Sequence, residues 1–400
     1  MLWASLLILQ AAVYMLTWSA YRRSDALYGT DFVIFYTAGR LVNSGHRSQL
    51  YDLDAQRAVQ AAIPGLYHFA GGANLFQHPP FLAPLLAFLA LADFSQAFIW
   101  WTLVRIGIVA ACTVGIFSWL SANHMGHKTA FWMAISSAAF YPLFLSLLGG
   151  QDTVFVLAGL LFWFAGLKSR QDIRAGLGLA WATLSPTIAG ALGLITLASR
   201  RRAAVWFIVG SLVLGLYSLA LVGWKGSLDF ISLLRLSSSS DQFGLNPTVM
   251  YNFLGLLMRL FPGLTLSAAR QAAWIFYIAF IASMCLWWWR NGSRLRVEHM
   301  GIALLGVVFL SPHLHIHSLS YLLIPLLGVG MVWFRRGGLL GSLSVGLIPL
   351  SSISILLASL SGGGMVYYVV YGWMVFLVGC LVENLRHPER DSDFSAGRAF

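Results

Sequence analysis

Long apolar runs without alternating polarity dominate this chain of 400 residues and constrain its fold more than any other feature. Bilayer hydrocarbon offers the backbone no hydrogen-bond partner, so a membrane-spanning chain must form helices or a closed barrel. The runs are about 15–23 residues long and lack the period-two pattern of barrel strands. The composition agrees, since 58% of the residues are hydrophobic, 10% are charged and the mean hydropathy is +0.76. The sequence therefore predicts an all-α, polytopic transmembrane protein.

The apolar runs give about twelve candidate spans, which predicts a transmembrane helical bundle. Several runs are short enough for the helix to be tilted, broken or partly buried in protein. We expect residues 1–385 to form one transmembrane domain and residues 386–400 to form a polar cytoplasmic tail. The candidate spans are residues 2–20, 80–93, 97–120, 129–148, 152–167, 175–198, 203–222, 271–289, 297–311, 318–334, 339–360 and 364–383.

Basic residues lie in short clusters between the runs and outnumber acidic ones, giving a net charge of +11. Such clusters mark the cytoplasmic ends of spans and can also contact anionic head groups. Because they form no single basic patch, we expect membrane lipids and not nucleic acid as partners. The clusters are Arg22-Arg23, Lys168 to Arg174, Arg200 to Arg202, Arg290 to Arg296, Arg335-Arg336 and Arg386 to Arg390.

Two of these clusters conflict with a simple arrangement of twelve spans in an inner (plasma) membrane. With the tail in the cytoplasm, both Arg22-Arg23 and Lys168 to Arg174 would face outward, against the positive-inside bias. The second cluster returns to the inside if residues 175–198 form a re-entrant hairpin that turns at Ser185-Pro186-Thr187. The sequence leaves both arrangements open.

One long polar loop, residues 21–79, interrupts the apolar sequence directly after the first run and faces outward in this scheme. Residues Asp31 to Asn43 and Leu53 to Ile63 carry apolar side chains at helical spacing, with Gly45 and Pro64 as stop signals. We predict two helices that lie in the membrane interface with their apolar faces toward lipid.

A set of short motifs begins in the polar loop and continues along the chain in a fixed order. They are Gly29-Thr30-Asp31-Phe32, Tyr51-Asp52, Phe76-Gln77-His78-Pro79-Pro80, Gly149-Gly150-Gln151 and Ser311-Pro312-His313-Leu314-His315. This ordered set, spread over roughly residues 25 to 335, resembles the membrane glycosyltransferases of family 87 in the GT-C superfamily.

The resemblance implies an inverting hexosyltransferase, with mannose as the first choice of sugar. Its donor would be a polyprenyl-phosphate sugar, its acceptor an extracytoplasmic lipid or glycan, and its active site would face away from the cytoplasm. The chain has no Walker loop or Rossmann fingerprint, and its only Asp-x-Asp, Asp391 to Asp393, lies in the polar tail. We therefore expect no nucleotide-linked donor and no cofactor. A transporter or lipid flippase without covalent chemistry is the alternative.

Asp31 is the candidate catalytic base. Moving a sugar from a lipid phosphate requires a group that takes the proton of the attacking hydroxyl, and the resemblance assigns this role to an aspartate in the first loop. The alternative is structural, because aspartate is also a favoured N-cap and Asp31 directly precedes a predicted helix. For Asp52, which precedes the second predicted helix, we expect capping.

Three alternating histidines, His313, His315 and His317, follow a Ser-Pro turn. In an extended segment this alternation puts all three imidazoles on one side. Three histidines can bind zinc, but no neighbouring carboxylate or thiol completes the set, so we expect no metal. The resemblance implies that His315 and His317 contact the leaving phosphate or orient Asp31. The alternative is that they are plain loop histidines.

Further polar residues are candidates for substrate binding, because a leaving phosphate needs positive charge or hydrogen-bond donors around it. We assign this role to Arg40, His78, Gln151, Arg259 and His313, although Arg259 follows an amphipathic run and can equally snorkel. The chain departs from the family pattern at two positions. Ser185 replaces a lysine that commonly precedes the proline matching Pro186, and His78 replaces a tyrosine.

Overall fold

The computed structural model describes residues 2–23, 25–66, 72–239, 246–292, 295–362 and 364–386, and within these ranges it contains helices and loops but no strand. The α-helices are α1 (Leu2–Arg23), α2 (Phe32–Asn43), α3 (Leu53–Ala61), α4 (Ala83–Leu89), α5 (Phe94–Ala122), α6 (His127–Ala138), α7 (Tyr141–Gly149), α8 (Thr153–Lys168), α9 (Asp172–Trp181), α10 (Pro186–Leu197), α11 (Arg201–Ser239), α12 (Phe253–Leu260), α13 (Leu266–Asn291), α14 (Val297–Leu310), α15 (Leu323–Arg336), α16 (Gly338–Ser344), α17 (Leu347–Leu360) and α18 (Met365–Arg386). Short 3₁₀ helices are η1 (Asp25–Gly29), η2 (Arg47–Gln49), η4 (Pro80–Leu82), η5 (Ala182–Leu184), η6 (Pro247–Val249) and η8 (Ile316–Leu322). The all-α polytopic fold is thus confirmed. The predicted tail, residues 386–400, lies outside the described residues except for Arg386.

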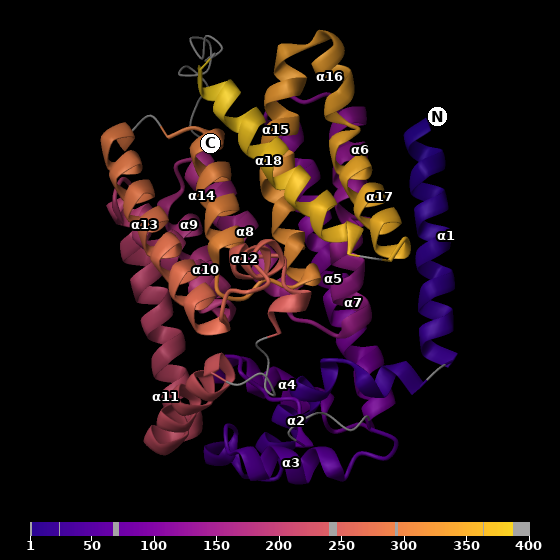
Figure 1. Ribbon diagram of the computed structural model, residues 1–400, viewed down its shortest axis with the longest axis vertical. Helices are drawn as coiled ribbons and strands as arrows, with labels where there is room; N and C mark the ends of the chain where they lie inside the picture. The colour runs from indigo at the N-terminus through magenta and orange to yellow at the C-terminus, as the bar shows by residue number, and fades with distance from the viewer. Residues whose placement is uncertain are drawn as a thin grey trace.

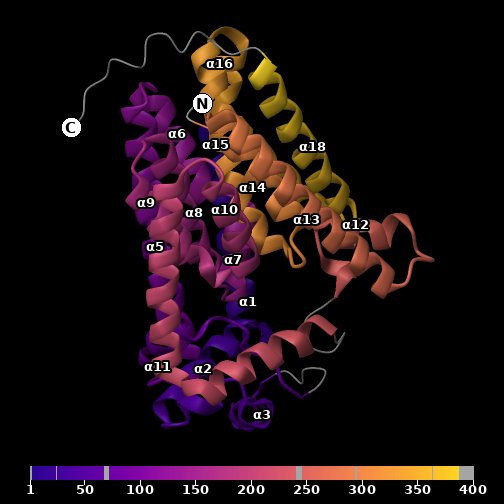
Figure 2. The ribbon, with the colours of Figure 1, turned by 90° about the vertical axis from the view of Figure 1, so that its left-hand side faces the viewer.

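The helices form a long bundle with a separate layer across its lower end (Figures 1 and 2). This lower layer consists of α2, α3, α4 and the second half of α11. Helix α11 bends at Gly223, whose φ of 71° and ψ of −178° are not helical, and its second half then runs along the layer (Figure 2). There the Phe230 ring lies 4.7 Å from the Tyr51 ring, measured between centroids. The polar loop therefore forms a folded platform beneath the bundle.

Seven described helices are long and apolar enough to cross a membrane, or eight if α16 and α17, bent by 55°, count as one broken span. The predicted span at residues 80–93 is wrong. It contains η4, the seven-residue α4 and a turn before α5. A helix of this length covers about 10 Å of the roughly 30 Å of hydrocarbon. Its apolar side chains Ala83, Leu86 and Leu89 are buried in protein instead.

Residues 175–198 form a helical hairpin, as the re-entrant alternative predicts, and neither of its helices is long enough to be a candidate span. Helix α9 runs antiparallel to α8, since a Cβ on Gly166 would meet Ala175 and one on Gly159 would meet Ala182. After the turn at Ser185, α10 returns toward its starting end, and the added Cβ atoms of Gly176 and Gly193 would both meet Phe207 of α11. The cluster from Lys168 to Arg174 consequently lies at the same end as Arg201.

Most basic clusters share the upper end of the bundle. Arg296, which precedes α14, donates through Nη2 to the carbonyl oxygen of Asn384 near the end of α18, at 3.1 Å. Figure 1 shows the end of α18 and the junction of α15 with α16 at the top, with the start of α1 on the same side. Arg22 and Arg23 end α1 at the opposite, lower side. They remain the exception to the positive-inside pattern.

Helices α2 and α3 lie where the sequence predicts them, but α2 does not face lipid. Ten of its twelve residues are buried, and Gly39 touches the backbone of Leu86 so closely that no side chain would fit. Helix α3 buries mainly Gln56 and Gln60, whose amides bond to the neighbouring loop. The apolar pattern of α2 therefore reflects burial against α4 and not against the bilayer. Asp52 caps α3, as predicted, by accepting from the backbone N–H of Ala55 at 2.8 Å.

Gly150 fixes the turn between α7 and α8, which leads to a first prediction. Its φ is +79°, and an added Cβ would lie 2.6 Å from the Cβ of Phe32. We expect Gly150→Ala to destabilise the fold by about 1–3 kcal/mol because of backbone strain, before the steric overlap is counted. The apparent Tm in detergent should fall by several degrees. Gly149→Ala is the matched control, since its nearest neighbour would lie at 3.9 Å. Equal Tm values for the two variants would contradict this reading.

Candidate functional site

Asp31 directly precedes α2 but does not cap it. Its backbone is helical (φ −67°, ψ −9°), and its side chain makes no capping hydrogen bond. Instead Oδ1 accepts from Nδ2 of Asn74 at 2.9 Å, and Oδ2 accepts from Nε2 of Gln151. Among the described residues no cation forms an ion pair with this carboxylate. The capping alternative is therefore wrong, and the carboxylate is held by neutral amides.

The first of these amides, Asn74, is itself fixed by α3. Gln60 donates through Nε2 to the carbonyl oxygen of Asn74 at 2.6 Å and accepts from its backbone N–H at 3.0 Å. Asn74 thus connects the buried face of α3 to Asp31. The sequence analysis missed it, because a lone asparagine in a polar loop carries no signal before its tertiary contacts are known.

The second amide, Gln151, is presented by a turn that a buried arginine holds. Arg105 lies in the middle of α5 with no exposed surface, and its guanidinium donates to the carbonyl oxygens of Ser146 at 2.8 Å and of Gln151 at 3.4 Å. Trp101, one turn earlier, donates through Nε1 to the carbonyl oxygen of Gly150 at 2.7 Å. The sequence analysis also missed Arg105. An ionisable residue inside an apolar run is a signal that could have revealed it.

The next residue of this turn, Asp152, contacts His78. Its Oδ2 lies 2.9 Å from Nδ1 of His78, and the two side chains are 8% and 20% exposed. The His78 ring packs against Phe35 and Phe76, with ring centroids 4.9 and 5.6 Å away. Tyr51 fixes the backbone of His78 by donating to its carbonyl oxygen at 2.7 Å. A buried carboxylate–imidazole pair therefore stands beside Gln151.

The three alternating histidines form a row of partly buried rings. Ring centroids lie 6.1 Å apart for His313 and His315 and 5.7 Å apart for His315 and His317. Burial, opposed by the charge of Asp31, lowers the pKa of His315, and burial together with His315 and Arg270 lowers the pKa of His313 to about 4. These two imidazoles are therefore neutral at pH 7. Within the described part of the chain, no group of three or more metal-binding side chains is arranged to hold a metal ion.

Hydrogen bonds from two other segments hold the loop that carries these histidines. Asn252 donates through Nδ2 to the carbonyl oxygens of Ser311 and Pro312, both at 2.9 Å, and the backbone N–H of Tyr251 donates to the carbonyl oxygen of Leu314 at 2.8 Å. The Ser311 hydroxyl lies 3.3 Å from that of Thr187 at the tip of the hairpin. The hairpin tip, including Ser185, therefore adjoins the histidine row.

Five of the predicted site residues come together. Asp31 accepts a hydrogen bond from Gln151, and the next residue, Asp152, pairs with His78. Charge interactions link Asp31 to His315 and His78 to His317. His313 extends the row toward Arg270. The cluster joins the lower layer to the bundle, because its members come from both.

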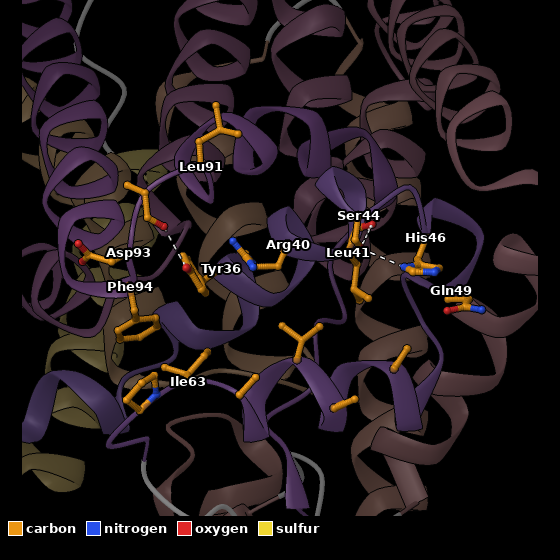
Figure 3. Close-up of a pocket in the computed structure, with 16 residues that line it drawn as sticks. Tyr36, Arg40, Leu41, Ser44, His46, Gln49, Ile63, Leu91, Asp93 and Phe94 are labelled. Carbon is orange, nitrogen blue, oxygen red and sulfur yellow. Dashed lines mark hydrogen bonds between the residues drawn. The ribbon is translucent and has the colours of Figure 1, made fainter.

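Two predicted residues lie elsewhere. Arg40 lines a groove of about 610 Å³ between α2 and α3, together with Tyr36, Gln49 and Asp93 (Figure 3). Its guanidinium makes one long hydrogen bond, 3.5 Å, to the carbonyl oxygen of Ala90.

Arg259 is engaged in packing α12 against α18. It donates to the Tyr371 hydroxyl at 2.9 Å and to the carbonyl oxygen of Thr248 at 2.8 Å, and its guanidinium carbon lies 3.4 Å from the centre of the Tyr367 ring. These contacts favour a structural role over an anion-binding one.

The lowered pKa of His313 leads to a prediction for acid stability. In the unfolded chain its pKa returns to about 6.5, so the unfolded state binds the proton more readily. The contribution to stability is therefore complete above pH 6.5 and is lost as the pH falls from 6.5 through about 4. We expect the apparent Tm of His313→Gln to decrease less between pH 7.5 and pH 4.5 than that of the wild type. The exposed His46, changed to Gln, is the control. An equal decrease in all three proteins would show the prediction to be wrong.

Comparison with known proteins identifies the family. The sequence model of glycosyltransferase family 87 matches residues 76–312, more than half of the chain. The matched range includes His78, Gln151 and Asp152 and ends at Pro312, within the Ser-Pro-His segment. No curated protein and no solved structure matches the chain. The chain belongs to glycosyltransferase family 87, and the cluster around Asp31 is the candidate active site of a membrane glycosyltransferase.

Proposed function

We propose that the protein transfers a hexose, with mannose as the first choice, from a polyprenyl-phosphate donor to a lipid or glycan acceptor, with inversion at the anomeric carbon. The observation that carries this proposal is the environment of Asp31. Its carboxylate makes no helix-capping hydrogen bond, is oriented by two amides and interacts with the charge of His315, at the junction of the bundle with the lower layer. A lipid head group and a water-side acceptor can meet at such a boundary.

The proposed reaction is a single displacement. The acceptor oxygen attacks the anomeric carbon as Asp31 takes its proton, the bond from that carbon to the phosphate oxygen breaks, and polyprenyl phosphate leaves with the electron pair. His315, His317 and His313 would donate hydrogen bonds to the phosphate. A neutral imidazole can do this through one N–H, and these rings have no hydrogen-bond partner elsewhere in the described residues.

The proposed location of the site is the extracytoplasmic side of an inner (plasma) membrane. The basic clusters at the upper end support this orientation, because positively charged loops stay in the cytoplasm. The cluster around Asp31 is at the lower end. A lipid-linked donor also fits a chain in which helices form the whole described fold, since a nucleotide-sugar donor would require a separate soluble domain.

The groove between α2 and α3 is a proposed second contact with substrate. Its volume of about 610 Å³ suits several sugar units or a lipid head group with part of its chain. Figure 3 shows Arg40 directed into it between Tyr36 and Leu41. Arg40 would then bind substrate away from the reacting centre, and its role differs from that of Asp31.

The base role of Asp31 is tested by Asp31→Asn. The amide keeps the size of the side chain but cannot take a proton, so we expect kcat to fall by about 100-fold or more. Transfer of radiolabelled sugar from polyprenyl phosphate is measured in membranes that carry either protein. Asp54→Asn is the matched control, because Asp54 is an exposed carboxylate of the same layer that pairs with Arg57.

The outcomes of this assay are distinct. Asp31→Asn with the wild-type rate would contradict the base role. Wild-type protein that moves a labelled solute across the membrane without forming a glycosylated product would replace the glycosyltransferase proposal with the transporter alternative.

The role of Arg40 predicts a different kinetic signature. Arg40→Gln should raise KM about tenfold and leave kcat within a factor of two, because one charge-assisted hydrogen bond to the bound substrate contributes about 1.5 kcal/mol. Arg57→Gln is the control, since Arg57 lies on α3 and pairs with the exposed Asp54. A decrease in kcat with unchanged KM would instead assign Arg40 to the chemical step.

A further inference from the structure

We propose that His78 and Asp152 form a second catalytic pair, in which Asp152 is the positioning residue and His78 donates its Nε2–H to the phosphate of the donor as it leaves. The inference rests on the polyprenyl-phosphate donor proposed above. It assigns the stabilisation of the leaving phosphate to a pair that adjoins Gln151 in the sequence, while Gln151 itself contacts Asp31.

Contacts on several sides fix the His78 imidazole and leave one nitrogen available. Asp152 lies 2.9 Å from Nδ1, and Phe35 and Phe76 pack against the ring. Nε2 has no hydrogen-bond partner in the part of the chain that the structure describes, and the side chain is 20% exposed. A ring that is clamped at one nitrogen and open at the other is suited to contact a ligand.

The buried carboxylate determines what the open nitrogen can offer. Asp152 Oδ2 lies 2.9 Å from Nδ1, within ion-pair distance, so the negative charge of Asp152 would compensate the charge of an imidazolium. In the proposed complex His78 would be the imidazolium that presents its Nε2–H to a phosphate oxygen. Oxygen atoms of a leaving phosphate accumulate negative charge, and a charged donor stabilises them more strongly than a neutral one.

The histidine row does not have this arrangement. No carboxylate contacts the rings of His313, His315 or His317 within hydrogen-bond distance in the described residues. For His313 and His315, which precede the candidate span, burial lowers the pKa of the imidazole. Among the imidazoles of the site in the described residues, His78 is therefore the one that has a carboxylate at a ring nitrogen.

Asp152 is itself held by the core of the bundle. Arg105 donates to the carbonyl oxygens of Ser146 and Gln151 and so fixes the turn that carries Asp152. The charge of Asp152 also interacts with Arg105 and with Tyr321. Buried groups of the bundle thus support the pair, and the preceding residue, Gln151, bonds to Asp31.

In the proposed step one bond breaks and one forms at the anomeric carbon. The bond between the anomeric carbon and the phosphate oxygen breaks, and its electron pair stays on that oxygen. The acceptor oxygen forms the new bond, and its proton passes to Asp31. His78 keeps its proton and shares it with the phosphate as a hydrogen bond, while Asp152 stays ionised.

The test compares kcat and KM for His78→Gln, Asp152→Asn and the double variant, using a polyprenyl-phosphate sugar as donor. We expect each single variant to lower kcat by about 10- to 100-fold with KM within twofold. The double variant should be no slower than His78→Gln alone, because Asp152 acts through His78. Asp229→Asn is the control, since Asp229 is a lower-end carboxylate that pairs with Lys225 at 2.7 Å, away from the cluster.

A rescue experiment separates chemistry from folding. His78→Ala leaves space for a ring next to Asp152, so free imidazole should restore transfer in this variant and restore less of it in His78→Ala/Asp152→Asn. If the wild type transfers sugar and both His78→Gln and Asp152→Asn keep the wild-type kcat, the pair is overturned. It is also overturned if the losses in kcat multiply in the double variant and imidazole restores no transfer. In both cases the proposed function stands. Absence of transfer from any polyprenyl-phosphate sugar by the wild type would overturn both.

Discussion

The buried guanidinium of Arg105 is the constraint on which the candidate site depends. A charged group in the interior of a span is costly unless nearby dipoles compensate it. Here the side chain donates to the carbonyl oxygens of Trp101, Ser146 and Gln151 and to the Thr102 hydroxyl. Two of these acceptors belong to the end of α7 and the turn after it. The hydrogen bonds that compensate the buried arginine are therefore also the ones that shape the turn. This turn positions Gln151 and Asp152.

The type of group that holds Asp31 matters as much as its position. An arginine or lysine partner would favour the ionised carboxylate and make it a weaker acceptor of the substrate proton. Asn74 and Gln151 supply hydrogen bonds that fix both oxygens without a full positive charge. The two amides come from segments 43 and 120 positions away in sequence. Their convergence is what distinguishes this positioned carboxylate from a helix cap.

The sequence predicted the structural features that depend on local pattern, and it missed those that depend on contacts between distant segments. Hydropathy gave the helical bundle, and the spacing around Asp31 and Asp52 gave α2 and α3. The run at residues 80–93 was misassigned because apolar composition cannot distinguish burial in lipid from burial in protein. For the same reason α2 was expected to face the bilayer although α4 covers it.

The site itself was only partly predictable. Motif order in the sequence brought forward Asp31, His78, Gln151 and the histidine row, and these residues do come together. Motif order could not exclude Arg40 and Arg259 from the site. In the sequence, an arginine in an outer loop gives the same signal whether it lies at the site or elsewhere on the protein. Asn74 and Arg105 were missed because their roles depend entirely on tertiary partners.

The departure at Ser185 acquires a physical context from the hairpin. Ser185 turns the chain between α9 and α10 at the point where Thr187 adjoins Ser311 and the histidine row. A lysine at this tip would bring positive charge to the row. In this chain the charge of Arg270 on α13 contributes to the lowered pKa of His313, and its buried Nε has no hydrogen-bond partner among the described residues. Tyr277, two turns later on the same helix, donates to the carbonyl oxygen of Thr187 at 2.6 Å and so attaches α13 to the tip. Helix α13 therefore brings both the contact with the hairpin tip and a cation that acts on the histidine row, so the packing of α13 against α10 couples the two.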